Sequence, residues 1–450
     1  MDQPPTEPRQ RRSRKGAWWR TLLVVVLVVL AVVGLIGSAW TLRSLVATPT
    51  TQARLVAQGH RLMEVTAASS PDPLRMQGYF PEGEFFTFIL AGIGLARLAN
   101  LGLYPDLDAH TRAVFLAGAL RTLEGIDTAQ VQDRFGRIDT LEYGVFYRGW
   151  RLALLNAIVA AGETRLVDEQ TTEAKAILDA VDSSRSGWVE GYPGAYWPCD
   201  TVVGLAAATE ALPGQAAPVV RRWLGLTTPT DVSGLLPHRV DATGRVLEGP
   251  HGSSQSLIQT FVPTLLAIAG QSESAQWTSF TTSFLARELG VVAFREWPSG
   301  QHGVGNVDSG PLIMGLSLSA SAVGLAAARA NGDQRLALAL DREVEWLALG
   351  VTTRGLRTYA LGLLPVGEAF IFWAKTTPMG VESDSASITV MWWLWALAFT
   401  LPALLLLGIS VGRRRAPKMT AQLPENDDQQ CHETPKRHSQ GLVWDADSGR

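Results

Sequence analysis

Residues 81–86 read PEGEFF and residues 365–370 read PVGEAF, so one pattern of proline, glycine and an acidic residue occurs near both ends of the central region. Each stretch opens an apolar run with helical periodicity. Similar helix starts lie between them, and the whole series is marked by Glu84, Glu142, Asp200, Ser256, Asp308 and Glu368. These positions recur about every 56 residues, a period that fits one pair of helices per repeat.

More amphipathic segments lie between the apolar helices, at residues 110–125, 165–181, 274–290 and 333–349. Their charged residues indicate an outer, solvated face. Six hairpins of alternating outer and inner helices predict an all-α fold, the (α/α)6 toroid. A linear helical solenoid is the alternative, and the return of the first motif in the sixth unit favours a closed ring. In a ring, all inner helices begin at the same end, so their loops surround one central cavity.

Both ends of the chain carry apolar runs beside basic residues. Residues 21–39 hold no charge and follow RQRRSRK, whereas the run 388–411 is followed by Arg413, Arg414 and Arg415. About 20 apolar residues cross a bilayer, and basic flanks favour the cytoplasmic side. The sequence therefore predicts a cytoplasmic basic segment (1–18), a transmembrane helix (19–41), an extracytoplasmic toroid (45–385), a second transmembrane helix (388–411) and a disordered cytoplasmic tail (412–450). The expected location is the plasma or inner membrane.

The composition excludes several classes of partner. The formal net charge is −3 and no basic stripe is present, which argues against nucleic-acid binding. No H-E-x-x-H or comparable ligand spacing occurs, and the glycine-rich stretch QHGVGNVDSG has no strand before it, so we expect neither a metal site nor a nucleotide cofactor. The expected partners are a small-molecule or carbohydrate ligand in the central cavity and the membrane. The oligomeric state is not predicted.

The helix starts supply the candidate catalytic residues. We single out Cys199, Asp200, Glu142 and Asp308, because carboxyl groups that converge on one cavity can divide into a proton donor and a proton acceptor. Glu142 and Asp308 come from units opposite one another in a ring of six. The alternative is that each acidic residue only caps its own helix. For Cys199, a helix N-terminus lowers the thiol pKa, and the neighbouring Asp200 raises it.

Aromatic and polar residues near the same helix starts are candidates for substrate binding. Rings can stack on a sugar or enclose an apolar substrate, although packing of the loops is the alternative role. His251 and His302 both lie in glycine-flanked loops. The predicted substrate-binding residues are Tyr143, Tyr147, Arg148, Glu190, Tyr192, Trp197 and His302.

Three segments resemble the linalool dehydratase/isomerase family, namely residues 145–166, 188–206 and 303–337. The first is similar to the family's Tyr-Lys-Gly-His helix start, and the second to its Glu-Pro-Asn-aromatic loop that ends in a cysteine. The resemblance implies an (α/α)6 toroid and places Cys199 at an active-site cysteine. Trp150 stands where the family has a histidine, and Val189 stands where it has a second cysteine.

These observations predict a membrane-anchored, cofactor-independent acid/base lyase or isomerase that acts on an amphiphilic alcohol. Two alternatives stay open. The same toroid suits a glycoside hydrolase or polysaccharide lyase with two catalytic carboxylates. It also suits a non-catalytic binding or envelope-assembly module, because a fold does not fix a function.

Overall fold

The structure is a computed structural model that describes residues 10–46, 50–227, 234–271, 274–382 and 391–415. The chain divides into two compact units, one of Met1–Val29 with Leu405–Arg450 and one of Leu30–Leu404. The predicted toroid region, 45–385, falls within the larger unit. Most of the predicted tail, together with Cys431, lies outside the described residues.

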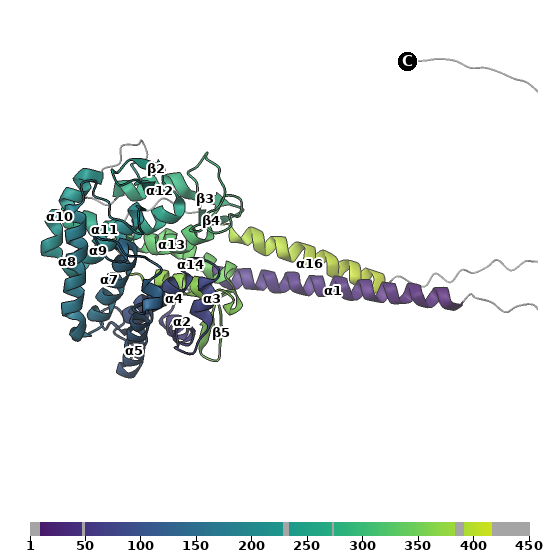
Figure 1. Cartoon of the computed structure of the whole chain (residues 1–450). Coiled ribbons are helices and arrows are strands. Elements are labelled where there is room, and N and C mark those ends of the chain that lie inside the picture. The colour runs from purple at the N-terminus through teal and green to yellow at the C-terminus, as the bar shows by residue number, and fades with distance from the viewer. Residues whose placement is uncertain (1–9, 47–49, 228–233, 272–273, 383–390, 416–450) are drawn as a thin grey trace, which may run out of the picture. The chain divides into compact units, whose positions relative to one another are not determined.

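Apolar helices of the larger unit, most of them labelled in Figure 1, have contacts that form a closed cycle. Each helix contacts the next along the chain, and the last contacts the first. Buried side chains cover most of their surfaces, which explains why these segments read as apolar all round. The inner helices are α4 (Gly83–Ala99), α7 (Gly144–Ala160), α9 (Pro198–Ala211), α11 (Gly252–Ala269), α13 (Leu318–Ala330) and α15 (Pro365–Thr376).

A second set of helices packs outside the inner ones. Along the chain, each outer helix contacts the inner helix that precedes it, as α5 contacts α4 and α14 contacts α13. The outer partner of α15 is α2, the helix with which this region begins. The outer helices are α2 (Gln52–Val65), α5 (Ala109–Ile126), α8 (Val167–Ser183), α10 (Pro213–Thr227), α12 (Ser274–Phe284) and α14 (Gln334–Leu347). Shorter helices are α3 (Asp72–Gln77), α6 (Ala129–Gln132), η1 (Thr164–Leu166) and η2 (Ala360–Gly362).

Local sequence explains where several helices begin. Asp108 caps α5 by accepting a hydrogen bond from the Thr111 amide at 2.9 Å, and Asp333 caps α14 in the same way at 3.0 Å. Ser317 caps α13, where its hydroxyl oxygen accepts from the Ala320 amide at 3.1 Å. Such side chains satisfy amide groups that have no partner inside the helix. Pro198 and Pro365 occupy the first helical positions of α9 and α15, where a missing N–H costs nothing.

The fold is mostly helical rather than all-α. Within the described residues, antiparallel pairs of short strands form three small sheets. The predicted outer helix 274–290 is wrong in its second half, because the chain leaves the helix after Phe284 and turns back at Leu289 and Gly290, both with positive φ. The strands are β1 (Arg239–Val240) with β2 (Val246–Glu248), β3 (Leu285–Glu288) with β4 (Val291–Phe294), and β5 (Val351–Thr353) with β6 (Leu356–Thr358).

Two helices are long and apolar enough to cross a membrane. They are α1 (Gln10–Val46), through its segment Trp18–Ser44, and α16 (Trp392–Arg415), through Trp392–Val411. Only 17% of the apolar window in each is buried, unlike a core helix of a soluble domain. Within the larger unit the two helices pack through small residues, where the hydroxyls of Ser38 and Thr400 lie 2.6 Å apart. Small residues allow helix backbones to approach closely in a bilayer.

Candidate functional site

Loops at the starts of α4 and α9 bring the phenol of Tyr192 close to the carboxyl groups of Glu82 and Asp200. Glu82 is the residue before α4, and Tyr192 lies in a tight turn closed by the Gly191 amide and the Ala195 carbonyl. The Tyr192 hydroxyl donates a hydrogen bond of 2.7 Å to Glu82 Oε1. Burial raises the pKa of Glu82, and this hydrogen bond opposes the shift. We refer to Glu82, Asp200 and Asp308 as the carboxyl cluster.

Asp200 and Cys199 form the buried part of this region, in the first turn of α9. The Cys199 thiol donates to Asp200 Oδ1 across 3.5 Å, and the two residues are 7% and 6% exposed. Burial raises the pKa of Asp200 well above its ordinary value, and the charges of Asp308 and Glu82 act in the same direction. Burial likewise raises the pKa of the Cys199 thiol, with Asp200 and Asp308 adding to the shift. The protonated forms of both groups are therefore favoured.

Asp308 joins the cluster from a loop, not from a helix start. The predicted helix start at Asp308 is wrong, because α13 begins at Leu318. Asp308 exposes half of its side chain, yet protein surrounds the carboxylate closely enough that desolvation, followed by the charges of Glu82 and Glu296, raises its pKa to about 6. The three carboxyl groups influence one another's protonation, because Glu82 raises the pKa of both Asp200 and Asp308.

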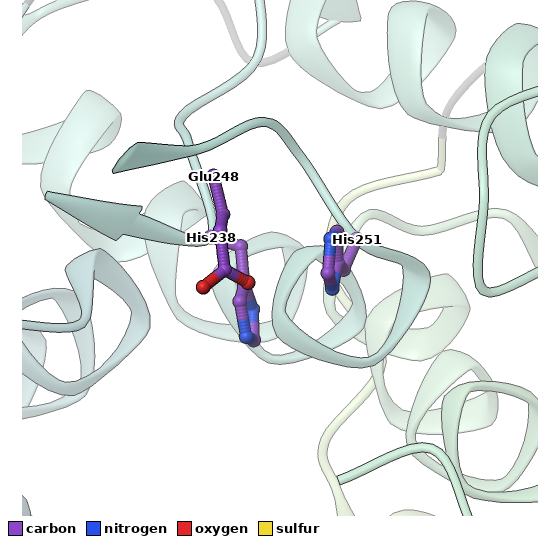
Figure 2. Close-up of side chains that lie close together, drawn as sticks. All are labelled: His238, Glu248 and His251. Atoms are coloured by element: carbon purple, nitrogen blue, oxygen red, sulfur yellow. The ribbon is translucent and has the colours of Figure 1, made fainter. Parts of the chain in front are cut away.

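A pair of histidines adjoins the carboxyl cluster. The rings of His238 and His251 stack with centroids 4.2 Å apart, and His238 Nε2 lies 3.8 Å from Asp308 Oδ2. Burial, His251 and Arg239 lower the pKa of His238 to about 3, so its imidazole is neutral at physiological pH. Glu248 offers a carboxylate oxygen to the same group of atoms, as Figure 2 shows. We refer to His238, Glu248 and His251 as the histidine cluster.

Glu296 fixes the position of His251. It is fully buried, and its carboxylate accepts hydrogen bonds from the Ser253 amide at 3.1 Å and the Ser253 hydroxyl at 2.8 Å. The first of these bonds gives a partner to a backbone amide in the first turn of α11, the helix that follows His251. His251 Nδ1 lies 3.5 Å from Glu296 Oε1, and the indole ring of Trp297 lies 4.4 Å from the imidazole, measured between centroids.

Several predicted site residues lie away from these clusters. Tyr147 donates a hydrogen bond of 2.8 Å to Asp127, and Arg148 forms an ion pair with Glu173 of α8, so both side chains join α7 to outer parts of the fold. Glu142 is exposed two residues before α7. The prediction that Glu142 faces Asp308 has no support in the described contacts, since the charges acting most strongly on Asp308 come from Glu82 and Glu296.

Other helix-start residues have structural partners. Glu84 pairs with Arg134, and Glu368 accepts hydrogen bonds from Arg61 and from the Tyr359 amide. Ser256 lies inside α11 instead of at its start, where its hydroxyl donates to the Ala320 carbonyl at 2.9 Å. None of these three side chains caps its own helix, and each instead joins its helix to another part of the fold.

The remaining predicted residues lie near the carboxyl cluster or on exposed loops. Trp197 packs edge-on against Tyr192 at 5.6 Å, and Glu190 accepts from the Gly194 amide at 3.0 Å, in the turn that carries Tyr192. Tyr143 precedes α7 with φ 68°, a left-handed conformation that is uncommon for a bulky residue. His302 is exposed.

An aromatic layer connects the carboxyl cluster with the inner helices. Trp150 of α7 contacts Phe86 of α4, Phe261 of α11 and Trp373 of α15, with ring centroids 5.6 to 5.7 Å apart. Phe86 contacts Phe146, which in turn contacts Tyr192 at 5.4 Å. Trp150 is thus a packing residue among rings from four inner helices.

Sequence reasoning missed three residues of the two clusters, namely Glu82, His238 and Glu248, and it also missed Glu296 beside His251. Glu82 belongs to the quoted motif PEGEFF, where the sequence led us to its neighbour Glu84. The other three lie in or beside short strands between helices, and no spacing along the chain signals that the β1–β2 hairpin brings two of them together.

The chain was compared with protein-family models and with curated protein sequences, and no match was found in either comparison.

Proposed function

We propose that the protein is a membrane-anchored (α/α)6 toroid with an acid/base lyase or isomerase activity on a small, amphiphilic alcohol. The observation that carries the proposal is the pairing of the Cys199 thiol with the buried carboxyl group of Asp200, whose pKa is raised further by the charges of Asp308 and Glu82. The closed cycle of inner helices supports the toroid, since α15 contacts α4. The resemblance to the linalool dehydratase/isomerase family at Cys199 points to the same chemistry.

The proposed chemistry divides proton transfer between two carboxyl groups. Asp200 gives its proton to the substrate hydroxyl, and the C–O bond breaks with its electron pair leaving as water. Glu82 takes a proton from the neighbouring carbon, and the electrons of that C–H bond form the double bond. Both residues then return to their initial states by exchange with solvent. Groups whose environments separate their pKa values are suited to this division of roles.

The surroundings of the cluster suit an apolar substrate. Aromatic rings pack from Tyr192 through Phe146 and Phe86 to Trp150, and this buried layer keeps water away from one side of the cluster. Two membrane-length helices would hold this region next to the bilayer, from which an amphiphilic alcohol can partition. In the proposed topology both termini are cytoplasmic and the domain is extracytoplasmic.

The test begins with mass spectrometry of small molecules that co-purify with the full-length protein in detergent. The wild type and the variants Asp200→Asn and Asp168→Asn are then incubated with the compound found, and with a panel of amphiphilic alcohols, in ¹⁸O-labelled water. Asp168 is a matched control, because it also lies in the first turn of a helix but is exposed on α8. The readout is ¹⁸O in the recovered alcohol together with alkene formation.

We expect Asp200→Asn to lower turnover by about 100-fold or more, the usual effect of losing a general acid, and Asp168→Asn to leave it unchanged. Hydrolysis of a co-purifying sugar would instead support the carbohydrate enzyme. Tight ligand binding without turnover, equal in wild type and Asp200→Asn, would support the binding module. Either result would overturn the proposed lyase or isomerase.

A further inference from the structure

We propose that His238, Glu248 and His251 bind one divalent metal ion of the zinc class. The three side chains each offer a ligand atom, and these atoms lie within 4.8 Å of one another (Figure 2). This site is independent of the proposed acid/base activity and contradicts the sequence-based expectation that the protein holds no metal.

The local fold explains why these residues converge. His238 directly precedes β1, and Glu248 ends β2, so the pairing of the two strands places them at the same end of the hairpin. The His238 amide donates to the Glu248 carbonyl at 3.1 Å, which fixes the two backbones. His251 follows three residues later, at the position that caps α11. The β1–β2 hairpin and the start of α11 therefore bring the three metal-ligand candidates together, although their spacing along the sequence matches no metal-binding motif.

Both histidines are deeply buried and incompletely satisfied. Each is 4% exposed, and the Nδ1 atoms of His238 and His251 have no hydrogen-bond partner among the described residues. Buried polar atoms normally have a partner, and an exception calls for a missing ligand or ion. At His238 Nδ1 a metal ion would supply that partner, whereas His251 Nδ1 faces Glu296 Oε1 and leaves Nε2 for the metal.

Neighbouring carboxylates complete the arrangement. Asp308 Oδ2 lies 3.8 Å from one nitrogen of His238, and Glu296 Oε1 lies 3.5 Å from one nitrogen of His251. His238 can therefore bind a metal through Nδ1 while Nε2 faces Asp308, and His251 can bind it through Nε2 while Nδ1 faces Glu296. Carboxylates orient metal-bound histidines in this way. Glu248 Oε1 accepts from Arg239 at 2.7 Å, which leaves Oε2 for the metal.

The donor set selects the class of metal. Two imidazole nitrogens and one carboxylate oxygen suit zinc and similar late transition metals, whereas magnesium and calcium prefer oxygen ligands alone. Tetrahedral zinc ligands stand roughly 3.3 Å apart, so on binding the ligand atoms must move closer together and the two imidazole rings must turn out of their nearly parallel stack. The Glu248 side chain is 38% exposed and can make this movement. Three protein ligands leave a fourth position open, and the Asp308 carboxylate is a further oxygen donor beside His238.

The test uses the full-length protein in detergent, purified without a histidine tag, stripped with EDTA and titrated with Zn²⁺ against a chromophoric zinc indicator. We expect the wild type to bind zinc and to unfold at a higher temperature with it, because the ion binds the folded state. Mg²⁺ should give neither effect. Loss of an orienting residue costs 10- to 100-fold in metal affinity, so His238→Ala and His251→Ala should each weaken zinc binding by about 100-fold or more.

Two further variants make the test decisive. His110→Ala removes an exposed histidine of α5 and should retain the wild-type affinity. Glu248→Gln should weaken zinc binding by about 10-fold or more. Because the Glu248 side chain is partly exposed, this variant should fold, and it tests the site even if the histidine variants do not fold. Absence of zinc binding in the wild type would overturn the proposal. So would equal binding by a His238→Ala/His251→Ala double variant, which would place the zinc elsewhere, for example at His432 and His438 of the tail.

Discussion

The thiol of Cys199 and the carboxyl group of Asp200 lie 3.5 Å apart, both buried in the first turn of α9. A helix N-terminus alone would favour a reactive thiolate. Burial and the neighbouring acids outweigh that effect and raise the thiol pKa, so Cys199 stays a thiol and donates a hydrogen bond to Asp200.

The first prediction is therefore that Cys199 reacts slowly with alkylating reagents. In a Cys431→Ser variant Cys199 is the only cysteine. At pH 8 we expect iodoacetamide to label it at least about tenfold more slowly in the folded protein than in denaturant, as measured by mass spectrometry, because only the thiolate is the nucleophile. Rapid labelling, with a pH midpoint below the ordinary thiol pKa, would instead identify a nucleophilic thiolate. It would exclude a thiol that donates a hydrogen bond to Asp200.

A second prediction concerns the crossing of α7 and α9. A Cβ atom on Gly149 would lie 2.7 Å from the Cα of Gly204, so the two backbones meet without room for a side chain. We expect Gly149→Ala to destabilise the protein by about 1–3 kcal/mol, the usual cost of overpacking. Gly225 of α10 is the control, since a Cβ there meets nothing within 4 Å. Gly225→Ala should raise stability slightly, because alanine favours helix. Equal melting temperatures for the two variants would contradict the close crossing.

A third prediction follows from Glu343 of α14. This carboxyl group is buried and accepts hydrogen bonds from the Val292 amide at 2.7 Å and from the indole of Trp392 at 3.0 Å. Burial raises its pKa to about 8 despite these bonds. Below pH 4.5 both folded and unfolded states are protonated. Between pH 4.5 and about 8 only the unfolded state ionises, so the free energy of unfolding should fall as pH rises, by at most about 1.4 kcal/mol per pH unit.

Thermal unfolding of the full-length protein between pH 5 and pH 8 measures this slope. Glu343→Gln keeps a hydrogen-bond acceptor but cannot ionise, so its stability should depend less on pH than that of the wild type. Glu163→Gln is the control, because the hydrogen bond from Arg165 lowers the pKa of Glu163 to about 2, far below the tested range. An unchanged slope in Glu343→Gln would show that this carboxyl group ionises normally in the folded protein.

The sequence predicted the inner helices where local signals agree with the tertiary structure. PEGEFF and PVGEAF stand at the starts of α4 and α15, and Pro198 and Asp200 stand in the first turn of α9. It failed at Asp308, where Ser309, Gly310 and Pro311 imitate a helix start. There, Ile313 and Leu316 close a tight turn and Leu316 also bridges to Arg295, so the chain stays out of helix until Ser317 caps α13. Pairing with a distant segment outweighed the local signal.

The site was less predictable than the fold, for a physical reason. Asp200 and Cys199 belong to one helix turn and could be found from its sequence. Their partners Glu82 and Asp308 come from segments more than 100 residues away, and only the packing of the helices sets which charges meet. The same holds for His238 and His251, whose stacking depends on the register of a two-stranded sheet.

A fourth prediction tests the proposed topology. Basic residues lie just outside both apolar segments, and such flanks favour the cytoplasm. In intact cells we expect a membrane-impermeant maleimide to leave Cys431 unlabelled until the cells are permeabilised. Ala242→Cys, at an exposed position between β1 and β2, is the control and should be labelled without permeabilisation. The reverse pattern would place the domain in the cytoplasm.

The last prediction concerns the buried ions that join α14, α15 and β6. Glu345 accepts from Lys375, from Arg357 and from the Tyr359 hydroxyl, and Lys375 also pairs with Asp341 at 2.7 Å. Lys375 is 2% exposed, so Lys375→Met would take from the buried Asp341 the cation that pairs with it and would leave Glu345 with Arg357.

Removing one partner of a buried pair costs about 3–5 kcal/mol, whereas an exposed pair contributes less than about 1 kcal/mol. We therefore expect Lys375→Met to lower the melting temperature strongly. Arg165→Met, which breaks the exposed pair with Glu163, should hardly change it. Because α15 contacts α4 and closes the cycle of inner helices, the loss should also open that contact, measured as faster amide hydrogen exchange in α15 and α4 than in α9. Unchanged exchange in α15 would mean that apolar packing, not this ionic network, holds the last helix in the ring.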